Sequence, residues 1–547
     1  MNTKFSLSAI AAAMLLSACG GSSSGNPDPT PTPSDGTAEV LMDMSVVAVD
    51  DQPTMPAGWH EGAVFAEIYV RSYMDSDGDG IGDFQGLTSR LDYLQDLGVE
   101  GIWLLPINES SDNDHGYEVE NYRTMETDYG TREDFDEFLA QAHARGIGVI
   151  MDYVINHSSG ANPLFLDSDN SVGDKRDWYV WSETNPVEEE DGWIGYWGPG
   201  WHPGQNGGFY YGIFQHYMPD FNLHNQDVID FHHNNLRYWL NAGMDGFRFD
   251  AVGQLFENGP GHEGQTNQPE NMDVLFGLQQ LIMEDYSNRY IVCENPANVG
   301  DTNGPQGCGS AFAFGLNYQI MSTVINRSTD QYLAGYLSYD RLNEAGIILA
   351  NHDEFAGHRV YEQLNGNIDK YKLAAATLLT LPGRPFIYYG EEIGMGHTAG
   401  ATNDHALRAP MSWTAEGGFT EAAEPFRNHA GNVADFNVET AEADPDSLLN
   451  HYKTLIQLRK DTPALRYGSI SVLKDDEVLA YTREHQGTSV LVILNLSTAD
   501  VNVNLDLGGQ ETELTPLAGF GESPLTTSEY GELTTSLQPN SIGIYSY

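Results

Sequence analysis

The sequence predicts an α/β fold, a (β/α)₈ barrel with an inserted subdomain, followed by a separate all-β domain. Two observations favour this fold class. Short apolar runs alternate with stretches of helical spacing and charge through most of the chain, as in parallel sheets whose strands are joined by helices. From about residue 467, short strands replace this pattern. An open doubly wound sheet is the alternative, but no Gly-rich phosphate-binding motif follows the first strand.

Eight apolar runs are the predicted strands of the barrel. They alternate with helical stretches such as 132–145 and 228–242, an order that is typical of a TIM barrel. The sixth run is the weakest of them. The runs span residues 63–71, 101–106, 148–152, 246–250, 290–294, 310–313, 346–350 and 385–389.

The gap between the third and fourth runs, about 158–222, is long and rich in aromatic residues. A loop of this length is usually functional, and aromatic faces suit stacking on sugar rings. We expect most of these side chains to form the core of an inserted subdomain. A helix near 447–460 should close the barrel. The predicted divisions are a lipoprotein signal peptide at 1–18, a tether and N-terminal segment at 19–57, the catalytic barrel at 58–465 and a β-sandwich at 466–547, with strands at 469–473, 478–483, 489–496 and 541–545.

The N-terminus is a predicted targeting segment. Lys4 precedes the apolar run Leu7–Leu16, which is too short to span a bilayer. The following Ser17-Ala18-Cys19-Gly20 resembles a bacterial lipoprotein signal, in which Cys19 becomes the lipidated first residue. Residues 20–37 are rich in Gly, Ser, Pro and Thr, as in a tether. We expect export and a lipid anchor in the bacterial cell envelope, with the outer membrane favoured, or release outside the cell. An ordinary signal peptide is the alternative.

The composition excludes some partners. Lys+Arg number 25 and Asp+Glu number 79, which gives a net charge of −54. This charge argues against nucleic acid and anionic membrane surfaces, and it suits a neutral substrate in a salty or extracellular setting. Cys293 and Cys308 could pair or remain free, and the sequence leaves this question open together with the oligomeric state.

Acidic and basic residues gather where predicted strands end. In TIM-barrel enzymes the functional residues lie at the C-terminal ends of the strands. A buried carboxylate without a partner costs free energy of folding. Three carboxylates, two histidines and an arginine at one mouth therefore indicate a site. The residues at or just beyond these ends are Asp152, Asn156, His157, Arg248, Asp250, Glu294, His352 and Asp353.

The chemistry of this set is that of a retaining glycosidase, which needs one carboxylate as nucleophile and one carboxylic acid as proton donor. Asp250 is the better nucleophile because Arg248 beside it should keep it ionised. Glu294 is the better acid because it follows a buried apolar run. Asp353 can stabilise the transition state. His157 and His352 can donate hydrogen bonds to sugar hydroxyls, and a metal site at these histidines is disfavoured because no HxH or HExxH motif is present.

Four motifs resemble the signature regions of the α-amylase family of glycoside hydrolases. They are Asp152-Tyr-Val-Ile-Asn-His157, Gly246-Phe-Arg-Phe-Asp250, Glu294 after a short strand, and Asn351-His-Asp353. The resemblance covers roughly residues 58–547. It implies a retaining mechanism on α-glucosidic bonds, with the same roles for Asp250, Glu294 and Asp353. It also implies that Asp114 and Tyr117 line the subsite of the attacked sugar, where Tyr117 would stack on the ring. Met218-Pro-Asp-Phe-Asn222 resembles a further family region.

The segment Asp75–Asp83 (DSDGDGIGD) is a predicted calcium loop. Oxygen ligands at every second position, with glycines at the turns, suit Ca²⁺. Gly86 stands where a helix-flanked calcium loop would have its glutamate. A solvated acidic turn is the alternative. The predicted role of the ion is structural, and the predicted ligands are Asp75, Asp77, Asp79, the Ile81 carbonyl and Asp83.

The branch of the family is less defined. Gly253 and Gln254 stand where many starch amylases have a Lys-His pair that holds the leaving-side sugar. Segments 390–395 and 408–413 resemble oligoglucosidases, trehalose synthases and intermediate amylases, and Ala251 resembles members that act on α-1,4 bonds. We expect an α-amylase that cleaves starch-like glucans and maltooligosaccharides. The alternatives are an exo-acting α-glucosidase or a glucan transferase such as a trehalose synthase. A non-catalytic sugar-binding barrel is the alternative from another class.

Overall fold

The computed structural model describes residues 42–170, 174–189, 192–329 and 331–547. The predicted signal peptide, Cys19 and most of the tether lie outside the described residues. Among the described residues, no helix combines the length and the apolar character needed to cross a bilayer.

The predicted barrel is confirmed. Seven parallel strands lie in the order β10-β9-β5-β2-β1-β12-β11. At the sixth strand position, Ala311 pairs with Cys293 of β10, and Phe312 pairs with Gly346 of β11, so the weak run at 310–313 closes the ring. The strands are β1 Phe65–Ile68, β2 Gly101–Leu104, β5 Gly148–Tyr153, β9 Gly246–Phe249, β10 Tyr290–Cys293, β11 Gly346–Ile347 and β12 Arg384–Tyr388.

These strands are almost entirely apolar because both faces of the barrel sheet are buried. One set of side chains faces the surrounding helices, and the alternate set fills the barrel interior, as in other parallel sheets buried on both faces. Inside the barrel, the rings of Phe65 and Phe386 stack with centroids 4.5 Å apart. The remaining members of this interior cluster include Trp103, Ile150, Tyr290, Val292, Phe312 and Ile348.

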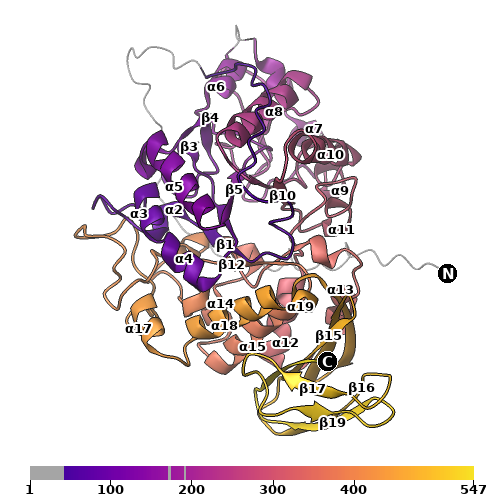
Figure 1. Cartoon of the computed structure of the whole chain (residues 1–547). Helices are drawn as coiled ribbons and strands as arrows, with labels where there is room; N and C mark the ends of the chain where they lie inside the picture. The colour runs from indigo at the N-terminus through magenta and orange to yellow at the C-terminus, as the bar shows by residue number, and fades with distance from the viewer. Residues whose placement is uncertain (1–41, 171–173, 190–191, 330) are drawn as a thin grey trace, which may run out of the picture.

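Helices surround the barrel (Figure 1). The helix at 132–144 is preceded by Thr131, which forms a capping box with Asp134 and so satisfies free backbone N–H groups of the first turn. The longer helices are α3 Phe84–Ser89, α4 Leu91–Leu97, α5 Arg132–Ala144, α6 Pro163–Asp169, α8 Gln226–Asn241, α10 Pro269–Met283, α12 Leu316–Asn326, α13 Gln331–Leu337, α15 Ile368–Thr380, α17 Val438–Ala443, α18 Leu448–Asp461 and α19 Pro463–Tyr467.

The segment between β5 and α8 folds around a small antiparallel sheet of order β6-β8-β7. As expected, most of its aromatic side chains are buried or pack half-buried against the core, while Tyr196 and Trp197 are exposed. A two-stranded sheet also precedes it, after β2. The strands are β3 Asn108–Ser110, β4 Val119–Met125, β6 Trp181–Ser182, β7 Trp201–Pro203 and β8 Phe209–Tyr211, and the buried aromatics are Trp178, Tyr179, Trp201, Tyr210 and Tyr211.

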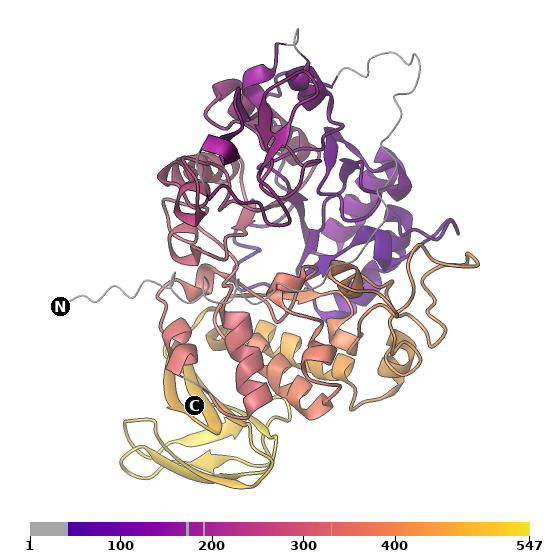
Figure 2. The same cartoon turned by 180° about the vertical axis from the view of Figure 1, so that it is seen from behind.

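The C-terminal domain is all-β and antiparallel. A six-stranded sheet of order β13-β14-β15-β20-β17-β18 and the pair β16-β19 share one apolar core. Figures 1 and 2 place this domain, in yellow, at the end of the molecule opposite the inserted subdomain. The strands are β13 Ser469–Asp475, β14 Val478–His485, β15 Thr488–Asn495, β16 Val501–Asp506, β17 Glu513–Pro516, β18 Leu525–Thr526, β19 Glu532–Leu537 and β20 Ile542–Ser546.

Two buried arginines, one on each side of the domain boundary, bind the same segment of the barrel. Arg459 of α18 donates from Nη1 to the carbonyls of Leu379 and Leu381, at 3.0 and 2.8 Å. Arg483 of β14 donates to the carbonyl of Thr380 in the same segment. Burial lowers the pKa of Arg483 to about 10, which is still high enough to keep it charged at neutral pH. The loop that leads into β12 is therefore held by cations from both sides of the domain boundary.

Cys293 and Cys308 form a disulfide, which answers the question that the sequence left open. Both cysteines are fully buried, and they are 15 residues apart in the sequence. Cys293 directly precedes Glu294. A loop of this length stabilises the fold by roughly 3 kcal/mol, mainly by restricting the unfolded chain. We expect the double variant Cys293→Ala/Cys308→Ala to lose about that free energy of unfolding in denaturant titrations. Reductant should then destabilise the wild type but leave the double variant unchanged, and equal stability of the two proteins would contradict the prediction.

Candidate active site

The predicted site residues converge at one mouth of the barrel. Because the strands are parallel, their C-terminal ends meet at the same side of the ring. Asp152 lies in β5, and Arg248 in β9 pairs with it in register. Asp250 follows β9, Glu294 follows β10, and Asp353 lies beyond β11. All five residues belong to the set that the sequence analysis placed at strand ends.

Arg248 is the centre of the site. Its Nη1 lies 2.7 Å from Asp250 Oδ1 and 2.8 Å from Asp152 Oδ1, and its Nη2 lies 2.6 Å from Glu294 Oε2. The guanidinium is fully buried and sits 5.2 Å from the centre of the Trp103 ring. The expected pairing with Asp250 is present. The bonds to Asp152 and Glu294 were not predicted, because sequence spacing gives no information on contacts between different strands.

Two of the three carboxyls that bind this guanidinium, those of Asp250 and Glu294, differ in proton affinity. Burial raises the pKa of Asp250 to about 6, although Arg248 opposes the shift. Arg248 lowers the pKa of Asp250 as expected and so favours its ionised form, but burial and the nearby Asp152 outweigh the cation in the net shift. Burial raises the pKa of Glu294 further, to about 7. Asp250 therefore loses its proton at a lower pH than Glu294 does.

Asp353 lies among cations. His352 Nε2 is 3.0 Å from Asp353 Oδ2, and Arg408 Nη2 is 3.2 Å from Asp353 Oδ1. Burial alone would raise the pKa of Asp353, but His352 and Arg408 hold it well below its usual range. His352 Nδ1 lies 2.6 Å from Glu67 Oε1. Burial disfavours the charged imidazole, yet Asp353 and Glu67 raise the pKa of His352 to about 10.

Glu67 was not predicted as part of the site. It lies in the buried strand β1 and is fully buried. A charged residue within an otherwise apolar strand is a signal that could have found it, because such residues are rarely buried without a partner. Its role is to fix the orientation and charge of His352.

Asp114 and Tyr117 lie on the loop after β3. Asp114 Oδ1 lies 2.7 Å from Arg427 Nη2, and Asp114 Oδ2 lies 3.2 Å from His405 Nδ1. Burial would raise the pKa of Asp114, but these groups and Arg408 hold it well below its usual range. Arg427 and His405 come from a late segment of the chain that no sequence motif marked.

Tyr117 contacts two other site residues. Its hydroxyl donates to Asp152 Oδ2 at 2.9 Å and lies 2.7 Å from His352 Nε2. Its ring stacks on the His352 ring, with centroids 5.7 Å apart. His157 is buried nearby, with its ring centroid 5.1 Å from that of Phe214. Burial lowers the pKa of His157 to about 3, so its imidazole is neutral and can act as either donor or acceptor.

Three of the predicted calcium ligands come together. Asp75, Asp77 and Asp83 place carboxylate oxygens within 4.8 Å of one another. This donor set fits Ca²⁺, which binds oxygen ligands in flexible geometry. Asp79 instead accepts from the N–H of Ile81 at 2.7 Å, within the same turn. Asp83 also caps α3 by accepting from the N–H of Gly86.

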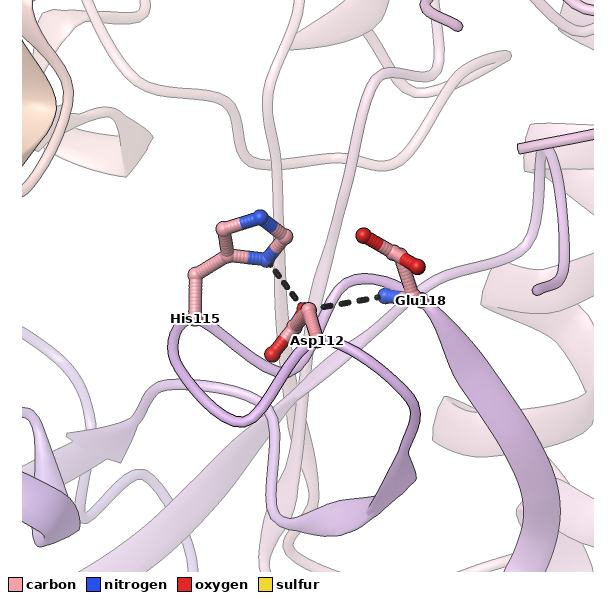
Figure 3. A group of neighbouring side chains, drawn as sticks. All are labelled: Asp112, His115 and Glu118. Atoms are coloured by element: carbon pink, nitrogen blue, oxygen red, sulfur yellow. Dashed lines mark hydrogen bonds and ion pairs between the residues drawn. The ribbon is translucent and has the colours of Figure 1, made fainter. Parts of the chain in front are cut away.

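A second group, Asp112, His115 and Glu118, lies close to Asp114 and was not predicted (Figure 3). The Asp112 carboxylate accepts from the N–H groups of Asp114 and Gly116, at 2.7 and 3.1 Å, and His115 Nδ1 lies 2.7 Å from it. These bonds fold the loop tightly. The cluster therefore orders the segment that presents Asp114 and Tyr117 to the barrel mouth.

Comparison with known proteins agrees with this geometry. The model of the α-amylase catalytic domain matches residues 67–468, and the model of the maltogenic amylase C-terminal domain matches residues 470–544. The chain belongs to the α-amylase family of glycoside hydrolases. It is thus an enzyme of the glycoside hydrolase and transferase type, with the barrel and the C-terminal all-β domain of its family.

Relatives within the α-amylase family differ in their named activities. The chain is 35% identical to alpha-amylase 3 of Dictyoglomus thermophilum, over 82% of this chain and 87% of that protein. It is 32% identical to trehalose synthase/amylase TreS of Mycobacterium tuberculosis, over 88% of each chain. Among solved structures, an α-amylase from H. orenii is similar with a TM-score of 0.74 and 32% identity, covering 89% of this chain and 99% of that chain. A probable oligo-1,6-glucosidase of Bacillus subtilis is 29% identical, over 81% of this chain and 92% of that protein.

Proposed function

We propose that the protein is a retaining α-amylase that hydrolyses α-1,4-glucosidic bonds in starch-like glucans and maltooligosaccharides. Asp250 attacks the anomeric carbon, and Glu294 protonates the departing oxygen and later removes a proton from the incoming water. Asp353 stabilises the positive charge of the transition state. Asp114 and Tyr117 hold the attacked sugar.

The observation that carries this proposal is the shared guanidinium. Arg248 bonds to Asp250 and Glu294 at once, at 2.7 and 2.6 Å. Two carboxyls that bind one guanidinium lie near each other, as the nucleophile and the acid of a retaining enzyme do, whereas inverting enzymes leave room for a water between them. The higher pKa of Glu294, about 7, suits the acid, and the lower pKa of Asp250 suits the nucleophile.

The α-1,4 specificity is supported by the similarity to alpha-amylase 3 of Dictyoglomus thermophilum, 35% identical. A time course on soluble starch tests it. Internal cleavage should produce mixed oligosaccharides together with a rapid fall in viscosity. Glucose as the sole early product would contradict the α-amylase proposal and favour an exo-acting α-glucosidase.

A trehalose-synthase-like transferase is the second candidate, because the similarity to the Mycobacterium tuberculosis protein covers 88% of each chain. Such an enzyme uses the same glycosyl-enzyme intermediate but passes the glucosyl group to a sugar. Incubation with maltose separates the two proposals. Conversion of maltose mainly into trehalose favours the transferase, and release of glucose alone favours the hydrolase.

We also propose a structural Ca²⁺ held by Asp75, Asp77 and Asp83. A ligand present at 100 times its dissociation constant stabilises the fold by about 2.7 kcal/mol. We therefore expect a chelator to lower the melting temperature and added Ca²⁺ to restore it. Asp77→Asn should reduce this response, whereas the control Asp79→Asn, whose carboxylate lies outside the group of Asp75, Asp77 and Asp83, should retain it. An unchanged melting temperature in the presence of the chelator would contradict the proposed Ca²⁺ site.

We further propose export and lipid attachment at Cys19, on the sequence of the leader alone. Partition of the full-length protein between detergent and aqueous phases tests this. Wild type expressed in a bacterium that processes lipoproteins should enter the detergent phase, and Cys19→Ala should remain in the aqueous phase. Equal partition of both would contradict the lipid anchor while leaving export possible through an ordinary signal peptide.

A further inference from the structure

The barrel ring is held more weakly on one side of β10 than on the other. Towards β9, the strand pairs in register along its whole length. On the opposite side, the sixth strand position contributes an isolated bridge between Ala311 and Cys293. Cys293 donates its N–H to the Ser310 carbonyl, and Phe312 donates its N–H to the Cys293 carbonyl, both at 3.1 Å. The residue that follows this edge of β10 is Glu294, the proposed acid.

The disulfide fastens the same edge covalently. It joins Cys293, the last residue of β10, to Cys308 in the turn after the short helix α11 Val299–Thr302. The N–H of Cys308 donates to the Thr302 carbonyl at 2.9 Å, so this turn folds back onto the end of α11. Both cysteines are fully buried, and the bond therefore belongs to the rigid interior beside the site.

A second attachment lies on the other side of Glu294 in the sequence. Asn295 Nδ2 donates to Thr302 Oγ1 at 3.0 Å, and Asn295 Oδ1 accepts from the N–H of Asn298 at 3.2 Å. Asn295 and Thr302 are both buried. The residues directly before and after Glu294 are therefore both tied to the segment 298–308, which we call the acid brace.

The contacts of the Glu294 side chain explain why this backbone support matters. Arg248 Nη2 and the N–H of Ala251 both meet Glu294 Oε2, at 2.6 and 3.0 Å, and both belong to the β9 side of the site. The acid brace fixes the backbone from the opposite side. A proton donor must lie within hydrogen-bond reach of the departing oxygen, and a displacement of 1 Å can cost about 100-fold in rate. A small shift at the end of β10 therefore acts directly on proton donation.

We propose that the Cys293–Cys308 disulfide and the Asn295–Thr302 hydrogen bond position Glu294 for proton donation, so that full activity depends on oxidation of the two cysteines. This inference rests on the proposed function, because it concerns the acid of the same site. The four residues act through Glu294 and not on the sugar itself.

Oxidation of the cysteines needs an external disulfide as the oxidant. The two thiols form the S–S bond, and the external disulfide takes up their two protons and two electrons and becomes two thiols. Such exchange takes place in oxidising compartments, and the predicted leader would direct the chain to one.

The dependence of cleavage on the leaving group tests the acid brace in the full-length enzyme. Phenyl and 4-nitrophenyl α-maltoside place similar rings on the leaving side, but phenoxide is the more basic group and depends more strongly on protonation. In Cys293→Ala/Cys308→Ala, the ratio of kcat/KM for the phenyl substrate to that for the 4-nitrophenyl substrate should fall about ten-fold. Thr302→Val keeps the side-chain shape but loses the hydroxyl, so it should lower this ratio by less. The control Thr302→Ser keeps the hydroxyl and should leave the ratio unchanged.

Refolding of the wild type tests the dependence on oxidation. Wild type refolded with dithiothreitol should show the lowered ratio, whereas refolding with oxidised glutathione should give the higher one. The double cysteine variant should show the lowered ratio after both treatments. Equal ratios for reduced and oxidised wild type would overturn the inference.

Leu491→Ala controls for a loss of stability alone. Leu491 is fully buried in the core of the C-terminal domain, so its truncation should destabilise the fold to an extent similar to loss of the disulfide. The ratio should nevertheless stay at the wild-type value. An equal fall in Leu491→Ala would overturn the inference, and so would an unchanged ratio in both the double cysteine variant and Thr302→Val. Failure of the proposed function is distinguishable, because the wild type would then release neither phenol.

Discussion

Replacing Asp250 with asparagine is expected to lower kcat on starch by about 10⁴-fold or more, because the neutral amide cannot form the glycosyl-enzyme bond. Asparagine has nearly the same shape, so the fold should be kept, and the melting temperature checks this. The comparison is steady-state kinetics on soluble starch at pH 6.5. A variant that retains more than roughly one hundredth of wild-type activity would contradict the assignment of Asp250 as nucleophile.

A smaller side chain at the same position gives a sharper test. Asp250→Gly removes the carboxylate and opens space at its place. Azide added to this variant should attack α-glucosyl fluoride in a single step and give the β-glucosyl azide. The inverted product shows that the missing group occupied the face opposite the leaving group. Absence of rescue in a folded variant, with rescue instead at Asp353→Gly, would exchange the roles of these two carboxylates.

Replacing Glu294 with glutamine is expected to lower kcat/KM on starch by about 10³-fold, because the sugar oxygen then leaves without a proton. The loss should be much smaller on α-glucosyl fluoride, since fluoride leaves without protonation. Equal losses on the two substrates would indicate that Glu294 supports the structure or the binding of sugar but does not act as the acid.

The pH dependence of activity tests the roles of Asp250 and Glu294 in a second way. Asp250 must be ionised, so activity should fall as the pH drops below about 6. Glu294 must be protonated, so activity should fall as the pH rises above about 7. The wild-type profile of kcat/KM should therefore be a narrow bell. The glutamine variant should lose the alkaline limb and keep the acidic one.

Local patterns were sufficient to predict the barrel and the positions of its functional residues. Strands buried on both faces must be apolar throughout, so runs such as 148–152 and 246–250 stand out from amphipathic helices. Once the strands are known, parallel topology brings residues such as Asp250 and Glu294 to one mouth without any further information. Even the weak run at 310–313 was predicted correctly as a strand position. It pairs with β10 and β11 on its two sides, which closes the ring.

Contacts between distant segments could not be predicted in this way. Arg408 and Arg427 meet Asp114 from about 300 residues away in sequence, and no local spacing encodes such a pairing. The net pKa of Asp250 depends on its full burial as well as on Arg248, so a sequence neighbour alone could not give the direction of the net shift. The pair β16-β19 was also missed, since its exposed face is polar and only alternate residues enter the core.

The arginines at the domain junction have a consequence for how this protein could be shortened or recombined. Arg459 and Arg483 satisfy carbonyls of one buried segment from both domains. A fragment that ends before β13 would lose Arg483, expose the Thr380 carbonyl to water and uncover the apolar side chains that pack against the C-terminal domain. The C-terminal domain therefore cannot be replaced by that of a relative without regard to these contacts. A chimera should be more stable when it keeps the arginine of β14 opposite the Thr380 carbonyl.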